Sequence, residues 1–279
     1  MRPAHSLVGA LAAMAGFAGL AHAEILVAPL RQVITAKEPV ARFRISNPSA
    51  RILEARVDWI DLVATPEGYA PAGAAERAKR SAAPYLVVSP ARLRLEPGGH
   101  AEVVVRLKKG VLIPAGERRS HLLVETTPAR TPLRRASTGL EVDVGLGVST
   151  PVILRGGYSA PALTFEHSRL VRDADGLLGF ETTLRGEGRY SAYGRIEALL
   201  ESDGRATILA SAANVTVYPD SGARKLTLPL ALEALPAGRM TVTYFSAGAG
   251  REEPLASKTF EVAPPAPPPI AEKKISSPR

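Results

Sequence analysis

The stretch that decides the fold is GLEVDVGLGVSTPVILRGG, residues 139–157. Apolar side chains occupy every second position in its first half, and charged residues, glycines and a serine stand between them; the apolar members are Leu140, Val142, Val144, Leu146 and Val148. A period of two is typical of a β-strand with one apolar face. The strand is long, at roughly nine or ten residues against a usual five or six. Gly145 and Gly147 leave its other face bare.

Short runs of the same kind, separated by Pro, Gly and Asn, fill most of the remaining chain. Residues 40–47 and 54–62 alternate clearly, and after Gly156-Gly157 the pattern starts again. The second half contains about seven strand-like runs, and many short strands divided by turns are typical of immunoglobulin-like sandwiches. The Ala-rich, charged segment 69–82 could form one helical turn or a loop. We therefore predict an all-β chain with two such sandwiches in tandem.

The composition shifts suggest where these domains begin and end. We expect the first domain over residues 24–157 and the second over 158–262, with Gly156-Gly157 as the hinge. Residues 263–279 are rich in proline and then basic, so they should be extended or disordered. This tail could dock on a partner or be a plain solvated terminus.

The first 23 residues resemble a secretory signal. Arg2 supplies a positive charge, residues 7–20 are apolar, and Ala21-His22-Ala23 is a small-x-small cleavage site. The alternative is a membrane anchor, but the apolar run is short for a bilayer. We expect an exported protein that starts at Glu24.

Charge and cysteine content narrow the function further. The chain has no cysteine, so disulfides and thiolate chemistry are excluded. Its net charge of +8 comes from scattered basic residues that no aromatic residues accompany. Together with export, this argues against nucleic acid and favours solubility, with an acidic partner as a further option.

No catalytic constellation is visible in the sequence. His100, His121 and His167 have no other ligand at metal-binding spacing. Ser120 precedes His121, but neighbours on one strand face opposite sides and cannot form a nucleophile–base pair. We therefore predict a protein that is not an enzyme and has no metal site or cofactor.

Three patches resemble the periplasmic chaperones of the chaperone–usher pilus pathway. ILVAPLRQVITAKEPVARFRISNPS (25–49) is similar to the family's first two strands, and VVSPARLRLEPGGHAEVVVRL (87–107) to its Pro-x-x-x-Arg-Leu-x-Pro-Gly stretch. IPAGERRSHLLVETTP (113–128) is similar to the segment that precedes the family's donor strand. Residues 139–157 then stand at the position of the donor strand itself. The resemblance covers residues 25–157 well and thins over 158–262. It implies a boomerang-shaped pair of sandwiches.

The resemblance also implies a mechanism. Pilus subunits are sandwiches that lack their last strand, and the chaperone lends its own strand to fill the gap, a form of β-strand addition. By position, the lent side chains would be Leu140, Val142, Val144, Leu146 and Val148. The partners would be pilus or fimbrial subunits and an outer-membrane usher, and the compartment would be the periplasm.

Three further residues carry over by position. Arg31 aligns with the arginine that binds the subunit's terminal carboxylate, and a guanidinium fork suits that task. Glu96 and Arg155 align with an ion pair that sets the angle between domains. The family's second clamp cation, a lysine, is replaced here by Pro151. Another cation, such as Arg106, could take its place, or the client could be anchored differently.

Two other classes of function stay open. A two-domain surface, adhesion or fibre protein would bury residues 140–148 in its own core and need no client. A hydrolase with an unrecognised site would show a pocket with convergent polar side chains.

Overall fold

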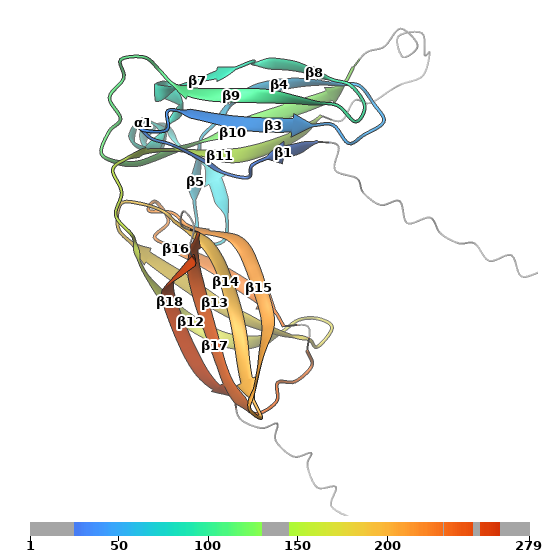
Figure 1. Cartoon of the computed structure of the whole chain (residues 1–279), viewed down its shortest axis with the longest axis vertical. Coiled ribbons are helices and arrows are strands. Elements are labelled where there is room, and N and C mark those ends of the chain that lie inside the picture. The colour runs from blue at the N-terminus through green and yellow to red at the C-terminus, as the bar shows by residue number, and fades with distance from the viewer. Residues whose placement is uncertain (1–24, 130–144, 231, 248–251, 263–279) are drawn as a thin grey trace, which may run out of the picture.

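The computed structural model describes residues 25–129, 145–230, 232–247 and 252–262 (Figure 1). The predicted signal peptide with its cleavage site, the tail, and three of the predicted donor residues (Leu140, Val142 and Val144) lie outside the described residues.

The first domain is a sandwich of two sheets. One sheet has the order β1-β3-β9-β7 and the other the order β2-β11-β10-β4-β8. The strands of the first sheet are β1 (Leu26–Ala28), β3 (Val40–Ser46), β9 (His100–Leu107) and β7 (Leu86–Ser89). Those of the second are β2 (Gln32–Ile34), β11 (Leu146–Gly156), β10 (Gly116–Pro128), β4 (Leu53–Ile60) and β8 (Arg92–Leu95).

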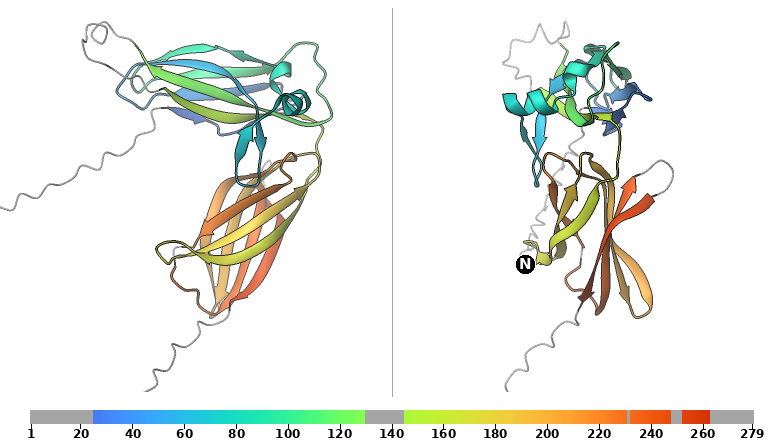
Figure 2. Two further views of the ribbon diagram at one scale, coloured as in Figure 1. Left: turned by 180° about the vertical axis from the view of Figure 1, so that it is seen from behind. Right: turned by 90° about the vertical axis from the view of Figure 1, so that its left-hand side faces the viewer.

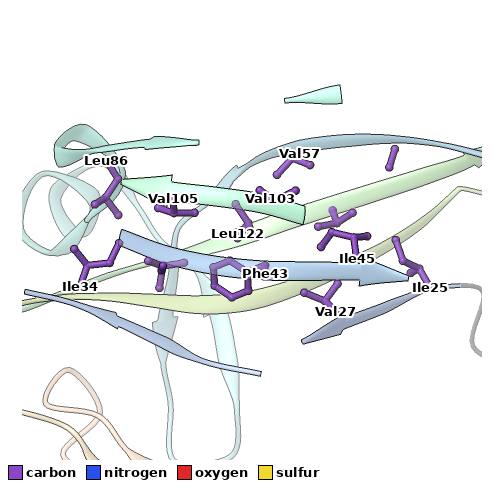
Figure 3. Packing of buried hydrophobic residues seen from close by; sticks show 14 of the residues in the cluster. Ile25, Val27, Ile34, Phe43, Ile45, Val57, Leu86, Val103, Val105 and Leu122 are labelled. Atoms are coloured by element: carbon purple, nitrogen blue, oxygen red, sulfur yellow. The ribbon is translucent and has the colours of Figure 1, made fainter. Parts of the chain in front are cut away.

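The alternation of the sequence places the core between these two sheets. In β3, Ala41, Phe43 and Ile45 point inward and are buried, whereas the residues between them are exposed. Val103 and Val105 of β9 join them from the same sheet, as Figure 3 shows. The inward faces of β4, β10 and β11 close the core from the other side.

The second domain is also a sandwich, and its core is separate from the first. One sheet has the order β12-β13-β16 and the other the order β15-β14-β17-β18. The strands are β12 (Ala162–Arg172), β13 (Leu178–Glu187), β14 (Ala192–Ser202), β15 (Arg205–Val217), β16 (Ala223–Pro229), β17 (Gly238–Ala247) and β18 (Glu252–Val262). Tyr244 is fully buried in this core and donates its hydroxyl hydrogen to Val215 O at 2.9 Å.

A hairpin of β5 (Leu62–Ala64) and β6 (Tyr69–Pro71) leaves the first domain and reaches the second (Figures 1 and 2). The backbone N–H of Lys225 in β16 donates to Pro66 O at the hairpin tip, over 2.7 Å. The helix α1 (Ala74–Arg80) follows the hairpin and gives the segment 69–82 about two helical turns.

The prediction of an all-β chain with two sandwich domains is confirmed. Figure 1 shows the two domains meeting at an angle. Within the residues described, no helix has both the length and the apolar character that crossing a bilayer requires.

Candidate functional site

Strand β11 has one fully paired edge and one that is largely open. On the first edge it pairs with β10 from Leu146 to Gly156. On the other edge it pairs in parallel with β2, over Val152–Leu154. In the described part of the chain no strand pairs with this second edge between Leu146 and Pro151, although the Thr150 hydroxyl donates to Leu30 O at 2.7 Å. Backbone groups along the open edge can therefore accept another strand.

The apolar face of β11 is continuous with the core of its own domain. Val152 and Leu154 are buried there, and Val148 is partly buried against the same core. Leu146, two residues earlier, is 41% exposed. Two of the predicted donor residues therefore lie in the described part of the chain. Val148 is partly packed against the core, and Leu146 projects away from it.

The bare face of β11 adjoins a groove on the outer side of the sheet. Gly145 and Gly147 line it together with outward residues of β4, β8 and β10, and its volume is about 760 Å³. A Cβ at Gly147 would lie 3.5 Å from Leu123 Cδ1, an ordinary contact distance, so this glycine is not required by crowding. Because Gly147 has no side chain, its backbone stays accessible from the groove.

Glu96 and Arg155 do not pair with each other. Arg155 lies opposite Glu117 in the β10–β11 ladder, and its Nη2 is 2.7 Å from Glu117 Oε2. Glu96 follows β8 and accepts from Arg94 Nε at 3.1 Å. The sequence prediction of a Glu96–Arg155 ion pair therefore needs correction, because Arg155 meets a carboxylate directly across its own ladder.

The Glu117–Arg155 pair nevertheless reaches the second domain, through Ser191. The backbone N–H and the hydroxyl of Ser191 both donate to Glu117 Oε2, at 3.1 and 3.0 Å. Arg155 Nη2 in turn donates to Ser191 Oγ at 3.3 Å. Ser191 immediately precedes β14, so this network ties the hinge strand to the second domain.

Arg31 lies at the same interface. Its Nη2 donates to Ser191 Oγ at 2.7 Å, and its guanidinium stacks 4.7 Å from the centre of the Tyr193 ring. Its Nε is buried and has no hydrogen-bond partner within the described residues. No carboxylate of the described residues forms a salt bridge with Arg31, whereas Arg155 and Arg119 each have one.

Arg106, the suggested replacement for the missing clamp lysine, lies elsewhere. It belongs to β9 of the other sheet and stands opposite Val40 and Val87 in the ladders. Pro151 itself lies opposite His121 of β10. Arg31, unlike Arg106, lies at this interface, and no acidic side chain of the described residues forms an ion pair with it.

A buried ion pair joins the two domains directly, and no local sequence pattern marks it. Arg119 of β10 lies 2.7 Å from Asp220 of the second domain, and each side chain is 7% exposed. The backbone N–H of Ala64 in the hairpin also donates to Asp220, at 2.7 Å, and Arg119 donates to Leu62 O at 3.0 Å. The Arg119 guanidinium stacks 3.9 Å from the centre of the Tyr218 ring.

Burial and the charge of Arg119 shift the pKa values of the titratable groups at this interface. It lowers the pKa of His121 to about 3, an effect that the Arg119 charge reinforces and Asp220 opposes. Burial also raises the pKa of Tyr218 above its usual value. For Asp220, burial favours the neutral acid, but hydrogen bonds and charge from Arg119 prevail and hold its pKa below the usual range.

Ser120 and His121 do not form a catalytic pair. Ser120 Oγ accepts from the backbone N–H groups of Ala82 and Ala83, at 3.0 and 2.9 Å, and donates to Asp61. His121 points to the opposite face, where its ring meets Tyr69 edge-on at 5.0 Å. Across the described residues, no group of three or more His, Cys, Asp or Glu could hold a metal ion.

Comparison with known proteins gives only distant likenesses. The sequence matches no protein-family model and no curated protein. Among solved structures, 86% of the chain aligns with all of the YadV chaperone at 11% identity and a TM-score of 0.44. The same share aligns with all of the CupB2 chaperone of Pseudomonas aeruginosa, at 17% identity and a TM-score of 0.42.

A third likeness is to a complex of the chaperone CsuC and the tip adhesion subunit CsuE, from the archaic chaperone–usher Csu pili of Acinetobacter baumannii. It covers 86% of this chain and 98% of the matched chain, at 16% identity and a TM-score of 0.44.

Proposed function

We propose that this chain is a periplasmic chaperone that binds pilus-type subunits and delivers them for fibre assembly at an outer-membrane usher. The observation that carries the proposal is the open edge of β11 between Leu146 and Pro151. In the sequence, the alternation of apolar residues continues before this edge, at Leu140, Val142 and Val144. A subunit strand added along this edge gains backbone hydrogen bonds, and alternate side chains fill its pockets.

The free energy gained when the donated side chains are buried is large enough to hold a subunit that lacks one strand. Burying one aliphatic side chain contributes roughly 1.5–3 kcal/mol. Four of them give on the order of 6–12 kcal/mol before ordering costs. Because Val148 is already partly packed, the residues before it carry most of this gain.

Arg31 is the proposed anchor for the subunit's terminal carboxylate. Arg119 and Arg155 are neutralised by Asp220 and Glu117, so they are poor candidates for a further anion. Arg31 has no acidic partner among the described residues, and its Nε is buried at the domain interface without a hydrogen bond. One arginine fork can hold a carboxylate through two hydrogen bonds, which makes a second cation at Pro151 dispensable.

The alternative is a two-domain surface, adhesion or fibre protein, and the packing of Val148 against its own core favours it. The two functions are separated by co-expressing the tagged chain in a periplasm with a pilus subunit encoded beside it. A chaperone yields a stoichiometric complex and prevents loss of the subunit. A structural protein leaves the subunit as unstable as it is alone.

A further inference from the structure

The outer face of the sheet β1-β3-β9-β7 is rich in arginine, and most of its side chains are exposed among the residues described. In Figure 1, no helix or strand is drawn in front of β3 and β9. We call this surface the cationic face and define it by ten of its outward side chains, which are Leu26, Ala28, Val40, Arg42, Arg44, Val87, His100, Glu102, Val104 and Arg106.

The arginines of this face exceed its acids. Glu102 is the acid among these ten side chains, and it pairs with Arg42 at 2.6 Å. Arg44 contacts His100 Nδ1 at 3.1 Å, and Arg106 has no polar partner among the described residues. The outer face of the other sheet is balanced instead, since Arg56, Arg92 and Arg94 share it with Glu54, Asp58 and Glu125.

Aliphatic side chains lie between these arginines. Leu26, Val40 and Val87 are 52%, 43% and 47% exposed. The ladders place Val40, Arg106 and Val87 in one row across three strands. A partner that covers this row would bury the valines and bring an acidic group to Arg106 in a partly desolvated setting, where the charge attraction is stronger than in water.

We propose that the cationic face binds an acidic protein surface, separately from any client held on β11. A second copy of the chain does not fit, because its net charge of +8 and this same face would repel. A membrane fits less well, because these ten side chains include no Trp, Tyr, Phe or Lys of the kind that anchors proteins at bilayer interfaces. Specific protein contacts combine charge complementarity with the burial of apolar side chains, and this face offers both.

Two soluble probes test the charge and the apolar part of the proposal: poly-L-glutamate and a glutamate–tyrosine copolymer of equal length. We expect both to bind the full chain at low salt, the copolymer more tightly. Arg44→Glu with Arg106→Glu should weaken poly-L-glutamate binding roughly tenfold or more. The matched control, Arg92→Glu with Arg94→Glu on the balanced face, has the same change in charge and should lose less than about threefold.

Val40→Ser with Val87→Ser should remove the copolymer's advantage and leave poly-L-glutamate binding unchanged. Circular dichroism and the urea midpoint establish that each variant is folded. Equal losses in the two arginine variants would overturn the proposal, as would wild-type protein that binds neither probe. The wild-type chain could instead bind phosphatidylglycerol vesicles more tightly than either polypeptide probe and lose that binding in Arg44→Glu with Arg106→Glu. That result would overturn the choice of a protein partner.

Discussion

Arg119 and Asp220 form a buried ion pair between the two domains, with 2.7 Å between Nη2 and Oδ2. The same carboxylate accepts the Ala64 N–H of the hairpin, so it joins β10, the hairpin and the second domain at one point. The angle at which the domains meet depends on this junction and on the Glu117–Arg155–Ser191 network.

Asp220→Asn should destabilise the protein by roughly 3–5 kcal/mol, because it leaves the Arg119 charge buried without a partner. Urea unfolding at pH 7 measures this. Asp58→Asn is the control, since its pair with Arg56 is exposed and should contribute about 0–1 kcal/mol. Since the folded pKa of Asp220 is lowered, its contribution is present above about pH 4 and disappears as the pH falls through the folded value. Equal losses of unfolding free energy in both variants would show that the buried interface pair stabilises the protein no more than the exposed pair does.

Because of His121, the protein should become less stable as the pH is lowered through mildly acidic values. Its pKa is about 3 in the folded protein, against about 6.5 when unfolded. The unfolded state therefore binds the extra proton between these values, and stability decreases by about 2–3 kcal/mol from pH 7.5 to pH 4.5 from this group. His121→Phe should flatten that decrease, and His100→Gln, at an exposed position, should not. An unchanged pH dependence in His121→Phe would contradict the assignment.

Gly194 is required by the approach of β14 to β17. A Cβ there would lie 1.8 Å from Phe245 O, whereas one at Gly68 would meet nothing within 4 Å. Gly194→Ala should cost roughly 1–3 kcal/mol of stability, and Gly68→Ala should be close to neutral. Thermal unfolding distinguishes them, and equal midpoints would show that the two strands can move apart at little cost.

Arg31→Ala should weaken binding of a subunit by about 10- to 100-fold, as loss of a charge-assisted hydrogen bond implies. Arg31→Lys keeps the charge but not the fork, so it should recover only part of this. Arg92→Ala, at an exposed position, is the control. Titration of the folded variants with a peptide of the subunit's C-terminus, with and without a terminal amide, isolates the carboxylate. If amidation weakens binding to wild type and to Arg31→Ala equally, the anchor is not Arg31.

The sequence predicted the strands well because their signal is local. The alternation of Ala41, Phe43 and Ile45 gives the inward face of β3 directly. The strand-like runs of the second half correspond to β12 through β18. Helix α1 was less certain, because a short Ala-rich segment has weak helical preference without packing.

The interface could not be predicted in the same way. Asp220 and Arg119 are distant in sequence, and nothing local marks either residue as a partner of the other. Arg155 was expected to pair with Glu96, but the register of β10 against β11 places Glu117 across from it. The register between two strands is set when the sheet forms. It cannot be read from a single sequence unless the pairing of the strands is known.

The most direct test of strand donation is the yield of subunit complex from Val144→Asp with Leu146→Asp. In the sequence both positions belong to the alternating apolar set. Leu146 is 41% exposed, so the chain itself should stay folded. The control is Asp143→Ala with Ser149→Asp, which moves a charge between positions that alternate with the apolar set in the sequence. Strand donation predicts no complex from the first variant and normal yield from the second; normal yield from both folded variants would contradict it.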